Sequence, residues 1–416
     1  MAQERLNFEL YGHFDVPCGL RVSAENTARH LAAQGERIRL HSVDRRVIET
    51  GPALAAGRTV NMFHVNPHEL RVALAFPHED PHFEDRLNVC VPFWELPRVP
   101  GFWVPVLGSM DLVLAPTRFV ADAVCVSLPD VPLILIPQGV DVPGDIRSDR
   151  ERFGLPEDAV IYGTSFAAEA VVERKNPWAS IAAFRRAFPT EPDVRLVVRA
   201  SPGDTADPRP LWDRLMEFAE HDPRVIIPEQ KLGYRDVLSL YASLNVYVSL
   251  HRAEGLGLGM MESMALGVPV IATGWSGNMD FTTPQNSLLV DYALVPIDVD
   301  PSSPYGQRAM STVESWAEAD VDDAAAKMRL LYDDPALRVR LGERARRDMA
   351  ERRLIVERAD FVREIREFYD AHSTVSVEHR RKARALRSIE RVQRLRYPYY
   401  ASRQLAGAML RKVGAR

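Results

Sequence analysis

The chain has 416 residues, of which 46% are hydrophobic, and a formal net charge of −5. This length predicts two or three domains with sizeable cores. No window approaches the roughly 18 uninterrupted apolar residues of a membrane span, and the opening "MAQERLNFEL" lacks the apolar core of a signal peptide, so we expect a cytoplasmic protein. The cysteines, Cys18, Cys90 and Cys125, lack the paired spacing of a zinc site or a disulfide framework and are interpreted as buried thiols.

Strand-like apolar runs alternate with helical patterns in the first third of the chain. The runs read "LNFELYGHF", "RIRLHSV", "VNMFHV", "LRVALAF", "LNVCVPFW", "DLVLAP" and "LILIP". After the first run and the loop "DVPCGLRVS" we predict a helix that Ser23 caps and Gly35 ends, with Ala24 and Leu31 on its buried face. The alternation predicts a domain over residues 1–143 that is built on a parallel sheet.

A second series of runs begins at Val160 and predicts another parallel-sheet domain, over residues 144–372. These runs read "VIYGTSF", "VRLVVRA", "RVIIP", "LNVYVSL", "PVIATG" and "NSLLVDY". The stretch 137–158 bears prolines and glycines and few apolar residues, so we interpret it as a hinge. Ligands of open parallel sheets bind beyond the carboxyl ends of the strands, which predicts a site in the cleft between the domains.

The stretch "HRAEGLGLGMMESMALGVPVIATG", residues 251–274, carries glycines at alternate positions where a strand-like run gives way to a helix. Gly255, Gly257 and Gly259 each cost roughly 0.5–1 kcal/mol in regular structure, so they need a local reason. They lie at a predicted helix N-terminus, whose unpaired N–H groups and positive dipole end suit a phosphate.

Two acids flank these glycines, Glu254 before the turn and Glu262 within the helix. Carboxylates repel phosphate but accept hydrogen bonds from vicinal hydroxyls, and a nucleotide sugar carries such hydroxyls at both ends of its diphosphate. A dinucleotide is the competing ligand, although its G-x-G-x-x-G fingerprint needs a glycine where Met260 stands. A structural turn with a helix-dipole acid is the third interpretation.

The segment "EGLGLGMMESMALGVPVIAT" resembles the E-x7-E signature of family 4 glycosyltransferases, and the similarity extends from about Val160 to Tyr292. The resemblance implies the α/β GT-B fold, in which two Rossmann-like domains face each other across a cleft, and hexose transfer with retention of anomeric configuration. It implies that Glu254 contacts donor-sugar hydroxyls and that Glu262 holds the ribose. The residues that it puts at the donor diphosphate are Gly255, Gly257 and Leu258.

In this family a loop of the second domain supplies a lysine, usually with an arginine about five or six residues earlier, to offset the diphosphate charge. Lys175 in "ERKNPW" matches the lysine, whereas Ala168 or Glu169 stands at the place of the arginine. We therefore predict that Arg174 substitutes for it. A solvated basic pair is the open alternative.

The first domain matches the family less closely. Gly19 lies in the first strand-to-helix loop and is predicted to approach the donor phosphate, with an ordinary turn as the alternative. His64, Asn66 and Glu95 follow later strands on the cleft side and are expected near the reacting centre. Glu95, in "WELP", stands where many family members carry a histidine and is predicted to bind hydroxyls, whereas His64 has the alternative of a hydrogen-bonded structural residue.

The expected reaction needs no metal and no cofactor other than the donor, a nucleoside-diphosphate sugar. Fixed positive groups, here Lys175, Arg174 and the helix N-terminus, would stabilise the leaving diphosphate. The acceptor is an unknown hydroxyl on a glycan, a lipid or a small natural product. A non-catalytic nucleotide-sugar-binding protein and a GT-B sugar-nucleotide epimerase or hydrolase stay open as alternatives.

Residues 373–416 form a basic tail, since twelve Lys or Arg residues between His379 and Arg416 stand against one acid, Glu390. We predict a helix that packs back on the N-terminal domain, as the final helices of family relatives do. The alternative is contact with an anionic membrane. The side chains for that contact are Leu386, Ile389, Val392, Leu395, Tyr397, Tyr399 and Tyr400. No recognition motif points to nucleic acid as a partner.

Overall fold

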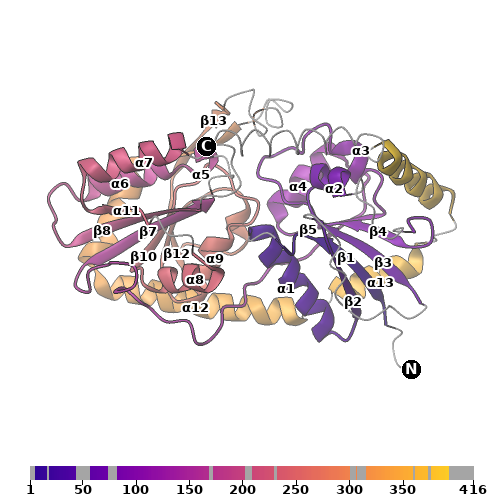
Figure 1. Cartoon of the computed structure of the whole chain (residues 1–416), viewed down its shortest axis with the longest axis horizontal. Helices are drawn as coiled ribbons and strands as arrows, with labels where there is room; N and C mark the ends of the chain where they lie inside the picture. The colour runs from indigo at the N-terminus through magenta and orange to yellow at the C-terminus, as the bar shows by residue number, and fades with distance from the viewer. Residues whose placement is uncertain are drawn as a thin grey trace, which may run out of the picture.

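Two domains of similar build lie next to each other in the computed structural model, each around a six-stranded sheet (Figure 1). The structure describes residues 5–15, 18–43, 57–73, 82–167, 172–201, 209–228, 232–299, 306, 315–358, 361–372 and 376–392. Within these ranges, no helix has both the length and the apolar character that crossing a membrane requires.

The first sheet is parallel throughout, with the strand order β2-β1-β3-β4-β5-β6. Its strands are β1 Asn7–Gly12, β2 Arg37–Ser42, β3 Thr59–His64, β4 Leu87–Cys90, β5 Leu112–Ala115 and β6 Leu133–Leu135. The strand order reverses between β1 and β3, and ligands of open parallel sheets bind beyond the carboxyl ends of the strands at such a reversal.

The second sheet is also parallel, with the order β12-β11-β10-β7-β8-β9 and its reversal between β10 and β7. Its strands are β7 Val160–Ala167, β8 Val194–Ser201, β9 Val225–Ile226, β10 Val246–Ser249, β11 Val270–Thr273 and β12 Ser287–Val290. An antiparallel ribbon of β13 Tyr292–Pro296 and β14 Ser315–Ala319 follows. The two predicted series of strands and the predicted α/β fold class are therefore confirmed.

Helices cover both faces of the sheets, and neighbouring strand residues accordingly enter different cores. Val248 belongs to the core beneath α6 (Pro177–Ala187) and α11 (Val321–Asp333), whereas the preceding Tyr247 belongs to the core beneath α8 (Tyr234–Ala242) and α9 (Leu258–Ala265). The helices are α1 Gly19–Ala33, α2 Pro67–Ala73, α3 Val104–Leu107, α4 Arg118–Ser127, α5 Val172–Lys175, α6 Pro177–Ala187, α7 Arg209–His221, α8 Tyr234–Ala242, α9 Leu258–Ala265, η1 Gly277–Asp280, α11 Val321–Asp333, α12 Pro335–Arg358 and α13 Phe361–Ala371.

The segment 137–158 joins the two domains but is tied to the second one. Val140, Ile146 and Leu155 are buried in a core of the second domain. Arg150 donates a hydrogen bond to Asn245 Oδ1 at 2.7 Å. The prediction that too few apolar residues could anchor this segment was wrong, because these three are spaced to reach one core.

The long helix α12 carries the chain back to the first domain along one side of the molecule (Figure 1). Ala345 and Met349 of α12 pack in a core of the second domain. Phe361 and Ile365 of α13 are buried in a core of the first domain. The chain thus re-enters the first domain before residue 372, where the sequence analysis ended the second domain.

The described part of the basic tail is a helix over residues 377–392. Ser376 caps it, because its Oγ accepts a hydrogen bond from His379 N at 3.0 Å. Leu386 is buried in a core of the first domain, and Ile389 packs against that core. Val392 is 41% exposed, and the other residues named for membrane contact lie outside the described ranges.

Three local predictions were wrong. The run "LRVALAF" is partly helical: Pro67 begins α2, and Glu69 accepts a hydrogen bond from the Asn66 N–H at 2.9 Å, which is a capping arrangement that outweighs the apolar run. Helix α1 begins at Gly19, so Ser23 lies buried inside it and does not cap it. Of the cysteines, Cys90 is buried, Cys18 is partly buried and Cys125 is exposed.

Candidate active site

A cavity of about 450 Å³ lies where the carboxyl ends of the two sheets face each other. Ser165 at the end of β7 and Ser249 at the end of β10 line it, so it sits at the strand-order reversal of the second sheet. Cys18, Gly19 and Arg21, at the start of α1, close it from the first domain. The predicted position of the site, in the cleft beyond the strand ends, therefore coincides with a cavity.

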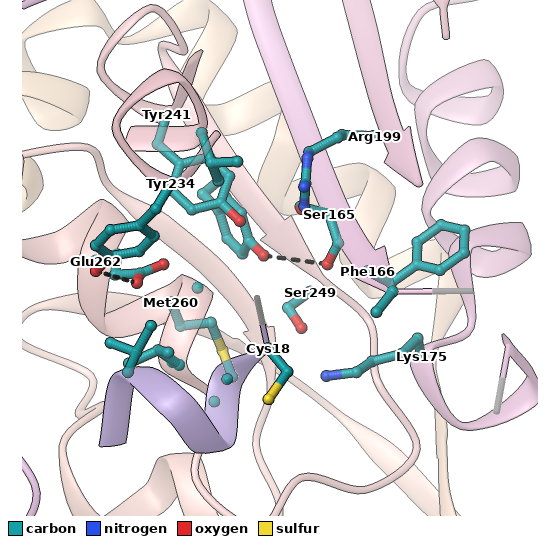
Figure 2. Close-up of a pocket in the computed structure, with 18 of the residues that line it drawn as sticks. Cys18, Ser165, Phe166, Lys175, Arg199, Tyr234, Tyr241, Ser249, Met260 and Glu262 are labelled. Carbon is teal, nitrogen blue, oxygen red and sulfur yellow. Dashed lines mark hydrogen bonds between the residues drawn. The ribbon is translucent and has the colours of Figure 1, made fainter. Parts of the chain in front are cut away.

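Glu262 points into one side of this cavity from α9, and Figure 2 shows it opposite Lys175. Tyr234, the first residue of α8, donates its hydroxyl proton to Glu262 Oε1 at 2.8 Å. Burial raises the pKa of Glu262 to about 7, although Tyr234 and Arg199 oppose the shift. A carboxylate has about four acceptor positions, so one bond to Tyr234 leaves it able to accept hydrogen bonds from a diol.

The N-terminus of α9 opens onto the cavity through Gly257, Leu258 and Gly259. Gly257 caps the helix with φ 95°, a left-handed conformation that a side chain would strain. The first N–H groups of a helix have no partner within it, and its dipole is positive at this end. The arrangement therefore suits an anion, as predicted for the diphosphate.

Gly255 has a different reason for being glycine. A Cβ at this position would lie 2.9 Å from the backbone oxygen of Trp94 in the first domain. Thr117 Oγ1, also from the first domain, donates to Gly255 O at 2.9 Å. Gly255 does not line the cavity. The first domain approaches the backbone of Gly255. This geometry does not support the prediction that Gly255 contacts the donor.

Four charged side chains from both domains meet beside the cavity. Lys175 Nζ donates to Glu254 Oε1, and Arg174 Nη1 lies 3.3 Å from Glu254 Oε2. Arg174 Nη2 lies 3.5 Å from Glu95 Oε1, which belongs to the first domain. Burial alone would raise the pKa of Glu254, but Lys175 and Arg174 lower it to about 2, so the carboxylate is ionised.

These four residues divide into two groups. Lys175 and Glu254 line the cavity, whereas Arg174 and Glu95 do not. Arg174 is 6% exposed and also donates to Ala253 O at 2.8 Å. The guanidinium of Arg174 thus bonds to protein acceptors. Arg174 and Glu95 link the two domains and do not lie in the cavity where they were predicted to contact a phosphate or a sugar.

Arg199 lines the cavity, whereas Arg174, the predicted substitute for the arginine missing at Ala168 or Glu169, does not. Ala168 and Glu169 lie outside the described ranges, and Arg199 reaches the cavity from the adjacent strand β8 (Figure 2). Its Nη1 donates to Ser165 Oγ at 3.1 Å. Arg199 was not predicted, although a charged residue at the carboxyl end of the predicted strand "VRLVVRA" is the signal that could have identified it.

His64 does not reach the cavity. It is fully buried, with Nε2 3.3 Å from Thr27 Oγ1 and 3.4 Å from Ser23 Oγ, both on α1. Burial lowers the pKa of His64 to about 4, so the ring is neutral. Asn66 accepts a hydrogen bond from Phe93 N at 2.8 Å. Both residues are therefore engaged in holding strand ends, and the catalytic prediction for His64 gives way to its structural alternative.

Part of the second domain matches a known family. Residues 165–298 match the family described as Glycosyl transferases group 1. A D-inositol 3-phosphate glycosyltransferase of Stackebrandtia nassauensis is 31% identical over 148 residues, which are 34% of this chain and 33% of that protein. The chain thus spans about a third of the length of the first curated relatives it matches.

Solved structures match over most of the chain. The sucrose-phosphate synthase of Thermosynechococcus elongatus superposes with a TM-score of 0.61 at 15% identity, covering 88% of this chain and 100% of that one. An Anabaena protein solved in complex with UDP and glucose gives a TM-score of 0.58 at 14% identity, with coverages of 88% and 100%. This chain therefore has the GT-B fold, and residues 165–298 resemble the group 1 glycosyltransferases.

Proposed function

We propose that this protein is a glycosyltransferase that moves a hexose from a nucleoside-diphosphate sugar to an acceptor hydroxyl. The observation that carries the proposal is one cavity lined by Glu262, by the N-terminus of α9 and by the Lys175–Glu254 pair. A nucleotide sugar presents a ribose diol, a diphosphate and a hexose in that order. Each lining group has the chemistry to bind one of these parts.

The relatives support the donor class. The match to group 1, over residues 165–298, contains Lys175, Glu254, the N-terminus of α9 and Glu262. The relative from Stackebrandtia nassauensis is named a glycosyltransferase, and the Anabaena protein was solved with UDP and glucose. We transfer to this chain the use of a nucleotide sugar and leave the base and the hexose open.

The proposed chemistry follows from the charges around the cavity. As the bond between the anomeric carbon and the diphosphate oxygen breaks, negative charge gathers on the leaving phosphate. Lys175, Arg199 and the N–H groups of α9 are fixed donors that stabilise this charge. The acceptor oxygen forms the new bond to the anomeric carbon, and its proton passes to the departing phosphate oxygen.

Retention of anomeric configuration and independence of a metal complete the proposal. Both are supported by the resemblance of "EGLGLGMMESMALGVPVIAT" to retaining enzymes. Arg21, Lys175 and Arg199 all line the cavity, and Lys175 and Arg199 are proposed to take the role that a metal ion would otherwise have. We propose no protein nucleophile, and the acceptor is a hydroxyl on a glycan, a lipid or a small natural product.

Calorimetry with a panel of nucleoside diphosphates, followed by transfer assays with the matching nucleotide sugars, tests this function. Glu262→Ala should weaken binding of the correct nucleoside diphosphate by roughly 30- to 1000-fold, or about 2–4 kcal/mol, because two charge-assisted hydrogen bonds are lost. Glu343→Ala, an exposed change on α12, is the control. Absence of binding across the panel, or release of free sugar with every acceptor tried, would overturn the proposal.

Membrane contact stands as a separate proposal for the part of the basic tail after residue 392, because Leu386 and Ile389 pack against the first domain. Flotation with anionic liposomes compares the full chain with a chain that ends at Val392. Salt-sensitive binding that is lost on truncation supports membrane contact. Failure of the full chain to float rejects it.

A further inference from the structure

Three side chains of types that can ligate a metal ion meet at the end of the first sheet opposite the cavity. Asp111 directly precedes β5, His372 follows α13, and His379 lies in the helix over residues 377–392. The cavity lies at the carboxyl ends of the parallel strands, whereas Asp111 stands at an amino end. None of the three residues lines the cavity. The cluster is therefore distinct from the proposed donor site.

The distances within the cluster are those of ligands around one small ion. Asp111 Oδ1 lies 3.1 Å from His379 Nδ1 and 3.2 Å from His372 Nε2, and the two ring nitrogens are 3.4 Å apart. Ligand atoms at about 2.0–2.1 Å from a tetrahedral zinc ion lie roughly 3.3–3.4 Å from one another. An ion can thus touch all three atoms after a shift of a few tenths of an ångström.

The hydrogen bonds around His379 favour a cation at the centre. His379 Nε2 lies 3.0 Å from Glu84 O, and a carbonyl only accepts, so Nε2 carries a proton. In the neutral form of the ring, Nδ1 has a lone pair that faces Asp111 Oδ1 and His372 Nε2. A proton on either histidine can bridge one of these contacts, whereas a metal ion can bind all three atoms. Metal-ligating histidines commonly donate their other N–H to a backbone carbonyl in this way.

The carboxylate is held in the matching orientation. Asp111 Oδ2 accepts hydrogen bonds from Asn88 N at 2.8 Å and from Asn88 Nδ2 at 3.3 Å, which leaves Oδ1 to face the histidines. Asp111 and His379 are fully buried, and His372 is partly exposed. Such outer hydrogen bonds fix a ligand before an ion arrives.

We propose that Asp111, His372 and His379 bind a divalent transition-metal ion, with zinc as the best match to two imidazoles and one carboxylate. A tetrahedral zinc ion has four ligands, so a water molecule would complete the set of three side chains. The ion joins β5, the end of α13 and the tail helix, so it clips the C-terminal segment to the first domain. It takes no part in the sugar chemistry proposed above.

Metal analysis of the purified full chain, after incubation with zinc and gel filtration, tests the proposal. We expect one zinc per chain and a melting temperature that rises with zinc. His372→Gln and His379→Gln should weaken zinc binding by more than the roughly 10- to 100-fold that loss of an outer-shell partner costs. The control is His221→Gln, on the exposed end of α7, which should bind as the parent does.

Loading the protein with Co²⁺ provides a second measurement, which tests the site even if His379→Gln does not fold. The parent chain loaded with Co²⁺ should show the visible absorption of a four-coordinate ion, and His372→Gln should lose it. The proposal is overturned if the parent retains neither zinc nor cobalt after gel filtration. It is also overturned if both cluster variants fold and retain as much zinc as His221→Gln, because the ion then binds elsewhere.

Discussion

Tyr234 holds Glu262 by a hydrogen bond of 2.8 Å at a position where the carboxyl residue is 4% exposed. Burial raises the pKa of Glu262 from 4.5 to about 7 in the folded protein. Between these two pH values the folded state keeps a proton that the unfolded state has released. The stabilising contribution is therefore present below pH 4.5 and is lost as the pH rises through 7.

The first prediction is that Glu262→Gln stabilises the protein more at pH 8 than at pH 5, because glutamine never acquires the buried charge. The pKa difference corresponds to a gain of about 3 kcal/mol at the higher pH. Denaturant unfolding at both pH values measures it. Equal effects of the substitution at pH 5 and pH 8 would mean that Glu262 is ionised in the fold at both.

The second prediction separates the two acids of the site. Glu254→Gln should lower turnover of the nucleotide sugar at least tenfold, because a sugar-binding carboxylate is lost, while affinity for free nucleoside diphosphate stays within about threefold of the parent. The substitution removes the negative charge that pairs with Lys175, so the attraction of Lys175 for a phosphate is not weakened. Kinetics and calorimetry on the same preparations give both numbers. A parallel loss of diphosphate affinity would contradict the division of roles.

The third prediction concerns Arg199. If its guanidinium meets the diphosphate, Arg199→Ala should cost about 1.5–3 kcal/mol in nucleoside diphosphate binding, or roughly 10- to 150-fold. Arg195→Ala is the matched control, since Arg195 lies on the same strand and donates to Pro192 O at 2.7 Å. Calorimetry should show near-parental binding for the control. Similar affinities for the two variants would remove Arg199 from the phosphate site.

The fourth prediction tests the approach of the two domains at Gly255. Gly255→Ala places a Cβ 2.9 Å from Trp94 O, a backbone atom that cannot rotate away, so we expect a loss of about 1–3 kcal/mol in stability. Gly144→Ala meets no atom within 4 Å and should change stability by less than about 0.5 kcal/mol. Thermal unfolding compares them. If Gly255→Ala leaves the stability unchanged, the backbone at Trp94 can shift to accommodate the added Cβ at little cost, which contradicts the prediction.

The fold could be predicted from the pattern of strands, and part of the site could be predicted from the stretch that contains the glycines and the two acids. The apolar runs predicted the strands because parallel strands are buried on both faces. Gly257 and Glu262 could be placed because α9 is the next element after β10 in the chain. Arg199 was missed because β8 becomes the neighbour of β7 only in the sheet. Asp111 and His379 are 268 residues apart, and no local pattern relates them. Helix α2 was not predicted because its apolar residues resemble those of a strand, although Asn66, Pro67 and Glu69 form a helix-capping sequence.

The return of α13 to the first domain determines the order in which the nascent chain can fold. The core that contains β1 and β3 also needs Phe361, Val362 and Ile365, which the ribosome adds some three hundred residues later. The six strands of the second parallel sheet lie between Val160 and Val290, so this sheet is synthesised in full before α13. During synthesis the first domain therefore stays with part of its core uncovered until α13 has been made.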